Sequence, residues 1–324
     1  MRELDEAAHK GDLAAVRVAL DLGANVNEPG DCCRTPLHKA ALKGHAEIAE
    51  MLLERRANVH ARDMFGNTPL LLALGVEMMR LLLDHGSDPL AVNAEGGTVL
   101  MNAGVAGMAA RLLEAGCDPN ATSPHNTPLY AATFANAGLL QLLLDRGADP
   151  SLPTLQVGSP LDNAAKCQKR EMVDLLVKYG ARHTLCTLAY LGEVGAICAR
   201  VAAGAPVDER NHWNSTPLHC AAQNGHLSVA ALLLDHGADL DAQDDGEFTP
   251  LLCAINCRRH AMAEFFIERG ADVSAKDHRG EGTLHWGLRR GDLDLLRLLL
   301  RSGATTWDEH LLKYLEKILA EDED

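Results

Sequence analysis

The chain has 324 residues, enough for about two ordinary domains, and 47% of them are apolar while 23% are charged. This balance is typical of a folded protein, and no apolar run reaches the length of about 18 residues that a membrane-spanning helix needs. Forty-five acidic residues against 30 basic ones give a net charge of −15. Such a charge repels phosphate backbones, so we expect no nucleic-acid partner.

Two further features of the composition favour an intracellular protein. The start of the chain, residues 1–6, is acidic and lacks the apolar stretch of a secretory signal. The nine cysteines are odd in number and do not follow the spacing of a secreted disulfide framework. We therefore expect a reducing, cytoplasmic location, no membrane association and a monomer.

A four-residue phrase of the type Thr-Pro-Leu-His recurs along the chain. Its copies begin at Thr35, Thr68, Thr98, Thr127, Ser159, Thr216, Thr249 and, in a degenerate form, Gly282. A second phrase of the type Gly-Ala closes each unit, beginning at Gly23, Arg56, Gly86, Gly116, Gly147, Gly180, Gly204, Gly237, Gly270 and Gly303. Such a regular period indicates an array of repeats rather than one globular core.

Each unit reads as two short helices, as residues 216–237 illustrate. Thr216 is a suitable N-cap, and Pro217 fits the first helical position because its missing N–H costs nothing there. Residues 224–225, Asn-Gly, end this helix, and a second apolar-periodic helix follows until Gly237. Because helices this short are marginal alone, each pair must bury its face against the next pair.

These phrases resemble the ankyrin repeat family. The resemblance is carried by the Thr-Pro-Leu-His opening, by the Gly-His helix breaks at residues 44–45 and 225–226, and by the Leu-Leu…Gly-Ala-Asp ending, and it covers residues 4–305. It implies an all-α solenoid of about ten stacked helix pairs, including degenerate terminal ones, with projecting β-turn fingers. It also implies that the fingers and first helices form a concave surface that binds other proteins.

Three places depart from the repeat pattern, taken in chain order. The first unit lacks the turn and has a polar outer face, as a terminal cap should. The units that begin at Thr68, Thr98 and Thr127 are shortened; residues 70–77 have lost three residues, close to one helical turn, against residues 37–47. We expect a step in the binding surface there, either a pocket or a shallow dent.

The third departure is a step of only 24 residues between the Gly180 and Gly204 markers, which leaves a unit without a finger. We predict N-terminal repeats over 1–182, C-terminal repeats over 183–306 and a capping helix with an acidic tail over 307–324. The alternative is one continuous solenoid in which this repeat is merely eroded.

Few residue groups suggest chemistry. Cys220, Cys253, Cys257 and His260 could form a metal or redox site, but they lack the spacing of structural zinc ligands, and packing explains them better. The adjacent Cys32 and Cys33 lie in a turn where a reactive thiol is conceivable. The repeat histidines His38, His219 and His285 are interpreted as structural, because in the resembling family this position hydrogen-bonds the turn and the next unit. We expect no cofactor, no metal and no enzymatic activity.

The best candidates for function lie on the fingers and at the ends of the first helices, where large apolar groups have little structural duty. The candidates for protein binding are Met64, Phe65, Phe134, Trp213, Phe248, Arg258, Arg259, Arg289 and Arg290. Aromatic anchors are the usual hot spots of protein interfaces. The sequence thus predicts a non-catalytic scaffold that binds a partner protein, with a metal- or redox-sensing protein, or an enzyme with a His/Cys site, as alternatives.

Overall fold

The computed structural model describes residues 3–154, 158–305 and 313–315. These residues form two compact units: unit 1 comprises residues 1–160 and 174–180, and unit 2 comprises residues 161–173 and 181–324. The division therefore passes through the repeat of helices α9 and α10. Most of the predicted capping helix, residues 307–324, lies outside the described residues.

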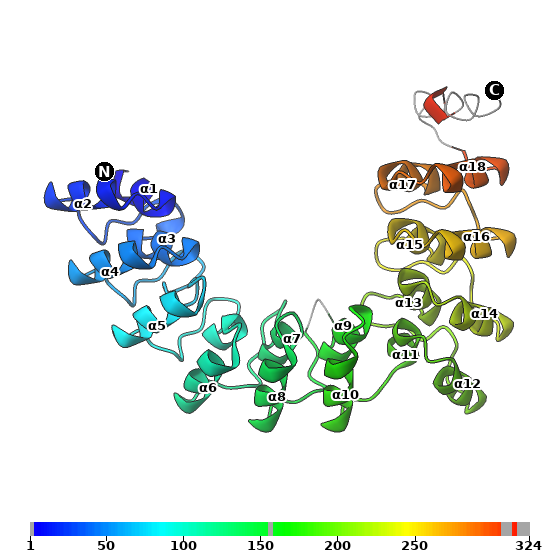
Figure 1. The fold of residues 1–324 in the computed structure, drawn as a ribbon, viewed down its shortest axis with the longest axis horizontal. Coiled ribbons are helices and arrows are strands. Elements are labelled where there is room, and N and C mark those ends of the chain that lie inside the picture. The colour runs from blue at the N-terminus through cyan, green and yellow to red at the C-terminus, as the bar shows by residue number, and fades with distance from the viewer. Residues whose placement is uncertain (1–2, 155–157, 306–312, 316–324) are drawn as a thin grey trace. The chain divides into compact units, whose positions relative to one another are not determined.

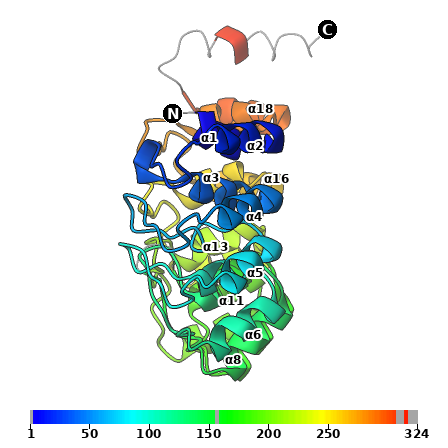
Figure 2. The same ribbon diagram turned by 90° about the vertical axis from the view of Figure 1, so that its left-hand side faces the viewer.

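In unit 1, helix pairs follow one another in successive layers (Figure 1). Its elements are α1 (Glu3–Lys10), α2 (Leu13–Asp21), η1 (Asp31–Cys33), α3 (Pro36–Lys43), α4 (Ala46–Glu54), α5 (Val76–Asp84), η2 (Val99–Asn102), α6 (Ala106–Glu114), α7 (Pro128–Ala132) and α8 (Ala137–Asp145). Figure 2 shows the loops of this unit on one side of the layers and helices α4, α5 and α6 on the other.

Helices α9 (Pro160–Lys166) and α10 (Arg170–Lys178) form the repeat at the division. In unit 2 the remaining pairs are again stacked in order (Figure 1). They are α11 (Leu185–Leu191), α12 (Val194–Ala202), α13 (Pro217–Asn224), α14 (Leu227–Asp235), α15 (Pro250–Asn256), α16 (His260–Glu268), α17 (Thr283–Arg290) and α18 (Leu293–Arg301).

The all-α solenoid of helix pairs is confirmed. The described residues contain isolated β-bridges, such as the one between Val92 and Thr98, but no β-strand. The described helices are also too short or too polar for any of them to cross a bilayer.

The repeated phrase builds the first helix as expected. The Thr216 hydroxyl accepts the N–H of His219 at 3.4 Å, Pro217 occupies the first turn, and Gly225 ends the helix with a left-handed φ of +80°. On the side away from its own turn, His219 lies with Nε2 2.9 Å from the backbone oxygen of Phe248 in the next finger. His38 makes the same bridge in unit 1, to the backbone oxygen of Asn67 at 3.0 Å.

The core runs along each stack as a row of small and branched side chains. In α13, Leu218, Ala221 and Ala222 are fully buried, and in α16 Phe266 is fully buried. Small alanines allow neighbouring helices to approach closely. Burial is thus shared between adjacent layers, as the shortness of the helices requires.

The prediction of two helices in every unit is wrong for two of the three shortened repeats. Residues 69–72 form only turns and residues 99–102 only the 3₁₀ helix η2, while α7 is an α-helix of 5 residues. The missing residues remove the turn that would complete a first helix, yet Leu70, Leu71 and Leu100 remain buried. The apolar anchors of these repeats are therefore kept while the helix itself is lost.

Candidate functional site

The fingers of unit 2 are fixed by one polar side chain at the same place in each. Asn211 Oδ1 accepts the N–H of Trp213 at 3.0 Å, and Asp244 Oδ1 accepts the N–H of Phe248 at 3.0 Å. Asp277 repeats the arrangement in the next finger. A short side chain that hydrogen-bonds the backbone of its own turn holds that turn in one conformation. Trp213 and Phe248 are therefore presented on rigid loops.

Three half-buried aromatic residues form what we call the aromatic row of unit 2: Trp213, Phe248 and Trp286. The rings of Phe248 and Trp286 meet edge to face, with centroids 5.3 Å apart and planes at 61°. The indole N–H of Trp286 donates to Asp277 Oδ2 at 3.1 Å. The row thus joins two fingers to the first helix α17.

Cationic side chains lie over the aromatic row. Lys166 Nζ is 4.9 Å from the centre of the Trp213 ring. The guanidinium carbons of Arg289 and Arg290 are 4.8 and 5.6 Å from the Trp286 ring. These distances lie within the range of a cation–π attraction. The stacking holds the cations against the face instead of leaving them free to swing into solvent.

A hollow of about 230 Å³ opens beside Trp213. Its lining includes Lys166, Tyr190, Trp213, Gln223, Asp244 and Phe248. Tyr190 in this lining belongs to α11, the first helix that follows the short connection of residues 179–184. The repeat with the irregular spacing thus contributes to the hollow beside the aromatic row.

The arginines predicted from sequence have different surroundings. Arg289 makes a two-fold ion pair with Glu281, with N···O distances of 2.9 and 2.7 Å. Arg290 hydrogen-bonds the side-chain oxygen of Asn256. Arg259 Nε donates to the backbone oxygen of Gln223 at 2.9 Å. Arg258 is exposed in the turn between α15 and α16.

Met64, Phe65 and Phe134 belong to unit 1. All three are strongly exposed, by 61%, 47% and 61% respectively. The Phe65 ring has the guanidinium of Arg34 at 6.0 Å, and Phe134 meets the edge of Tyr130 at 5.5 Å. These contacts leave about half or more of each phenylalanine exposed to water.

The step expected at the shortened repeats is a pocket. A hollow of about 260 Å³ lies between η2 and α7, and Leu100, Pro128 and Phe134 contribute to its lining. It is chiefly apolar, because the lost helical turns expose carbon rather than polar groups there.

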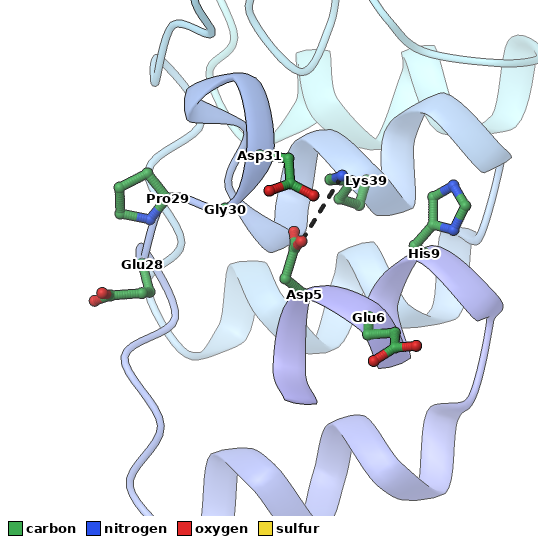
Figure 3. Close-up of a pocket in the computed structure, with 8 residues that line it drawn as sticks. All are labelled: Asp5, Glu6, His9, Glu28, Pro29, Gly30, Asp31 and Lys39. Carbon is green, nitrogen blue, oxygen red and sulfur yellow. Dashed lines mark ion pairs between the residues drawn. The ribbon is translucent and has the colours of Figure 1, made fainter. Parts of the chain in front are cut away.

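Another hollow of unit 1, of about 640 Å³, lies between α1 and the loop that precedes α3 (Figure 3). Four carboxylates line it, from Asp5, Glu6, Glu28 and Asp31, and the lysine that Figure 3 shows beside them, Lys39, pairs with Asp5 at 3.7 Å. Its lining contains no aromatic side chain, so it lacks the anchors that mark the surface of unit 2.

The cysteine and histidine groups considered for chemistry are separated by the fold. Cys253 is buried, and α15 ends before Cys257, which forms its C-cap. His260 begins α16 and lies with Nδ1 3.0 Å from Asp292 Oδ2. Within the described parts of the chain, no three His, Cys, Asp or Glu side chains are grouped closely enough to hold a metal ion.

Two members of the unit 2 surface were missed as site residues by sequence reasoning. Lys166 appears only as the end of a first helix, and Trp286 occupies the repeat position held by Cys220 and Cys253. The signal for Trp286 was available, since a tryptophan is far larger than the residues at the equivalent positions. Tyr190 is fully buried behind the hollow, and burial raises the pKa of its hydroxyl.

Family models for ankyrin repeats match residues 4–53, 65–94, 125–155 and 185–277, together more than half of the chain. The chain belongs to the ankyrin repeat family. Ankyrin repeats generally serve as protein-interaction modules. The fold and the repeated phrases described above are therefore those of this family.

Several curated proteins are similar to parts of this chain. The human transient receptor potential cation channel subfamily A member 1 is 25% identical over 238 residues, 72% of this chain and 17% of the channel. The serine/threonine-protein kinase VIK of Arabidopsis thaliana is 42% identical over 83 residues, 24% of this chain and 19% of the kinase. The ankyrin repeat-containing protein P1E11.10 of Schizosaccharomyces pombe is 31% identical over 91 residues, 28% and 44% of the two chains. The chain thus matches less than half the length of each of these relatives.

Proposed function

We propose that this ankyrin repeat protein is a non-catalytic scaffold that binds a partner protein through its concave finger/first-helix face. The observation that carries the proposal is the aromatic row of unit 2, in which Trp213 and Phe248 stand on rigid fingers beside a hollow of about 230 Å³. Half-buried aromatic side chains next to a concavity are the usual anchors of protein interfaces.

The surroundings of the thiols and imidazoles support a packing role over catalysis or sensing. Burial raises the pKa of the Cys253 thiol, and the Cys186 thiol lies against the backbone oxygens of Glu209 and Ser215. A nucleophilic thiol needs the opposite, a lowered pKa and access to solvent. All nine cysteines are free thiols, which supports a reducing, cytoplasmic location. We propose that the protein is a monomer.

The proposal is tested by comparing partner capture from native lysate by the wild type and by the double variant Trp213→Ala/Phe248→Ala. We expect the bound partner to be lost, while the thermal transition moves by only a few degrees because both rings are half exposed. The matched control is Phe265→Ala, which removes a half-buried ring that also carries a stacked arginine, Arg269, but lies on the second helix α16. Capture that survives the double change, or is lost equally in the control, would contradict the proposal.

A further inference from the structure

Three cations at or just beyond the ends of the first helices in unit 2 have no carboxylate partner among the described residues. Lys166, Arg259 and Arg290 have no carboxylate among the ion pairs that the described residues form. Their observed contacts are to neutral groups: the Trp213 ring, the backbone of Gln223 and the side chain of Asn256. The three cations lie on the face that carries the aromatic row, in a chain whose net charge is −15. We call these three residues the cationic row.

Contacts between layers bring the cationic row together. Arg259 reaches the backbone oxygen of Gln223 in α13, and Arg290 in α17 reaches the side chain of Asn256 in α15. The side chain of Asn224, next to Gln223, donates to the backbone oxygen of Lys166 at 3.4 Å. The three residues come from α9, from the N-terminal end of α16 and from α17, so residues distant in sequence are brought together by the stacking of the layers. A set of cations without carboxylate partners on one face favours an anionic ligand.

Three acidic side chains near the row, Asp244, Asp277 and Glu281, are already engaged within the protein. Asp244 Oδ1 and Asp277 Oδ1 accept backbone N–H groups of their own fingers, and Glu281 is paired with Arg289. Asp245 is exposed on the finger side of the hollow. The charges on this face are therefore separated. Carboxylates lie on the fingers, cations lie at the helix ends, and the aromatic row lies between these two groups.

We infer that the partner presents an extended acidic segment to this face. This inference rests on the proposed function. Its carboxylates contact Lys166, Arg259 and Arg290, and one apolar side chain enters the hollow beside Trp213. Charge complementarity selects the occupant, because the described ends of the first helices on this face offer these three cations and no free carboxylate. An extended peptide of about twelve residues, rising about 3.3 Å per residue, spans about 40 Å, enough to contact all three cations.

The test uses a fluorescein-labelled peptide of about twelve residues, all glutamate except one central leucine, and measures binding by fluorescence anisotropy. The comparison peptide carries lysine in place of glutamate. We expect the wild type to bind the glutamate peptide, to bind more weakly as salt is raised from about 50 to about 300 mM, and to ignore the lysine peptide. Arg259→Glu/Arg290→Glu should weaken binding by roughly tenfold or more.

The matched control is Arg269→Glu/Arg297→Glu, which makes the same change of charge on the second helices α16 and α18 and should alter the affinity by less than about twofold. If the Arg290 variant fails to fold by circular dichroism, Lys166→Glu/Arg259→Glu replaces it, since both of these side chains are exposed. Equal binding of the two peptides, or no effect of charge reversal, would overturn the inference. A partner whose capture is lost in Trp213→Ala/Phe248→Ala but kept in Arg259→Glu/Arg290→Glu would leave the proposed function standing and refute its acidic specificity.

Discussion

Nε2 of His219 lies 2.9 Å from the backbone oxygen of Phe248, so the first helix α13 is tied to the finger that carries one of the proposed anchors. On its other side, Nδ1 of the same ring is 2.8 Å from the hydroxyl of Thr216. The histidine of the repeated phrase thus links its own N-cap to the next layer. The prediction that His38 and His219 are structural is in this sense confirmed.

This arrangement predicts a loss of stability in mild acid. Burial lowers the pKa of His38 and His219, so the unfolded chain takes up protons at these residues at a higher pH than the folded protein does. The free energy of unfolding should therefore fall as the pH drops below about 6.5, the usual pKa of histidine. Thermal unfolding followed by circular dichroism between about pH 7.5 and about pH 5.5 measures the effect. In His38→Gln/His219→Gln the transition should be lower throughout but less dependent on pH; an unchanged slope would refute this explanation.

A second prediction concerns the shared core of unit 2. Phe266 is fully buried between layers, and Phe266→Ala should lower the free energy of unfolding by about 3–5 kcal/mol because it leaves a cavity. The adjacent Phe265 is half-buried with Arg269 stacked at 4.6 Å, so Phe265→Ala should cost much less. Urea unfolding of both variants compares the two costs. A larger loss from Phe265→Ala would contradict the packing described here.

Two left-handed glycines should respond differently to the same substitution. A Cβ on Gly237, at a φ of +85°, would meet nothing within 4 Å, so Gly237→Ala should cost about 1–2 kcal/mol from backbone strain alone. A Cβ on Gly192, at a φ of +76°, would lie 2.7 Å from Nδ1 of His226. That contact displaces the ring from the backbone oxygen of Tyr190, 2.9 Å away, so Gly192→Ala should cost more. If both variants lose the same free energy of unfolding in urea, the contact of Gly192 with His226 does not affect stability.

The thiols should separate by reactivity. Cys32, Cys33, Cys167 and Cys198 are exposed, so N-ethylmaleimide should label them within minutes in the native protein. The thiol of Cys117 should be protected, since burial raises its pKa to about 11, and Cys186, Cys220 and Cys253 should be protected by burial. Peptide mass spectrometry after brief labelling, with urea-unfolded protein as the control, checks this order. Rapid native labelling of Cys253 would contradict the packing role given to it.

Much of the fold could be predicted because each local signal agreed with the tertiary role of its residue. The phrase beginning at Thr216 supplies an N-cap, a first-turn proline and a buried leucine, and the structure uses all three. Residues 68–75 could not be predicted in the same way, since the phrase is intact there while the helix is absent. Whether a shortened segment forms a helix depends on the neighbouring layers, as the bond from the Leu74 N–H to the Ala41 backbone oxygen illustrates.

The candidate site was less accessible to sequence reasoning. The size of Trp213 and Phe248 at finger positions was a sufficient signal, and both line the hollow. The place of Lys166 over Trp213 was not predictable, because the two residues are separated by 47 positions in the sequence and meet only through the packing of the layers. Long-range stacking of this kind leaves no local pattern.

The repeats that lack a full first helix have a consequence for how unit 1 comes apart. In a linear array, each layer is stabilised by the surface that it buries against its neighbour. The turn at residues 69–72 and the 3₁₀ helix η2 bury less of that surface than a full first helix does. Amide hydrogens around these segments should exchange with deuterium before those of α3 and α8, so opening begins inside the stack rather than only at its end.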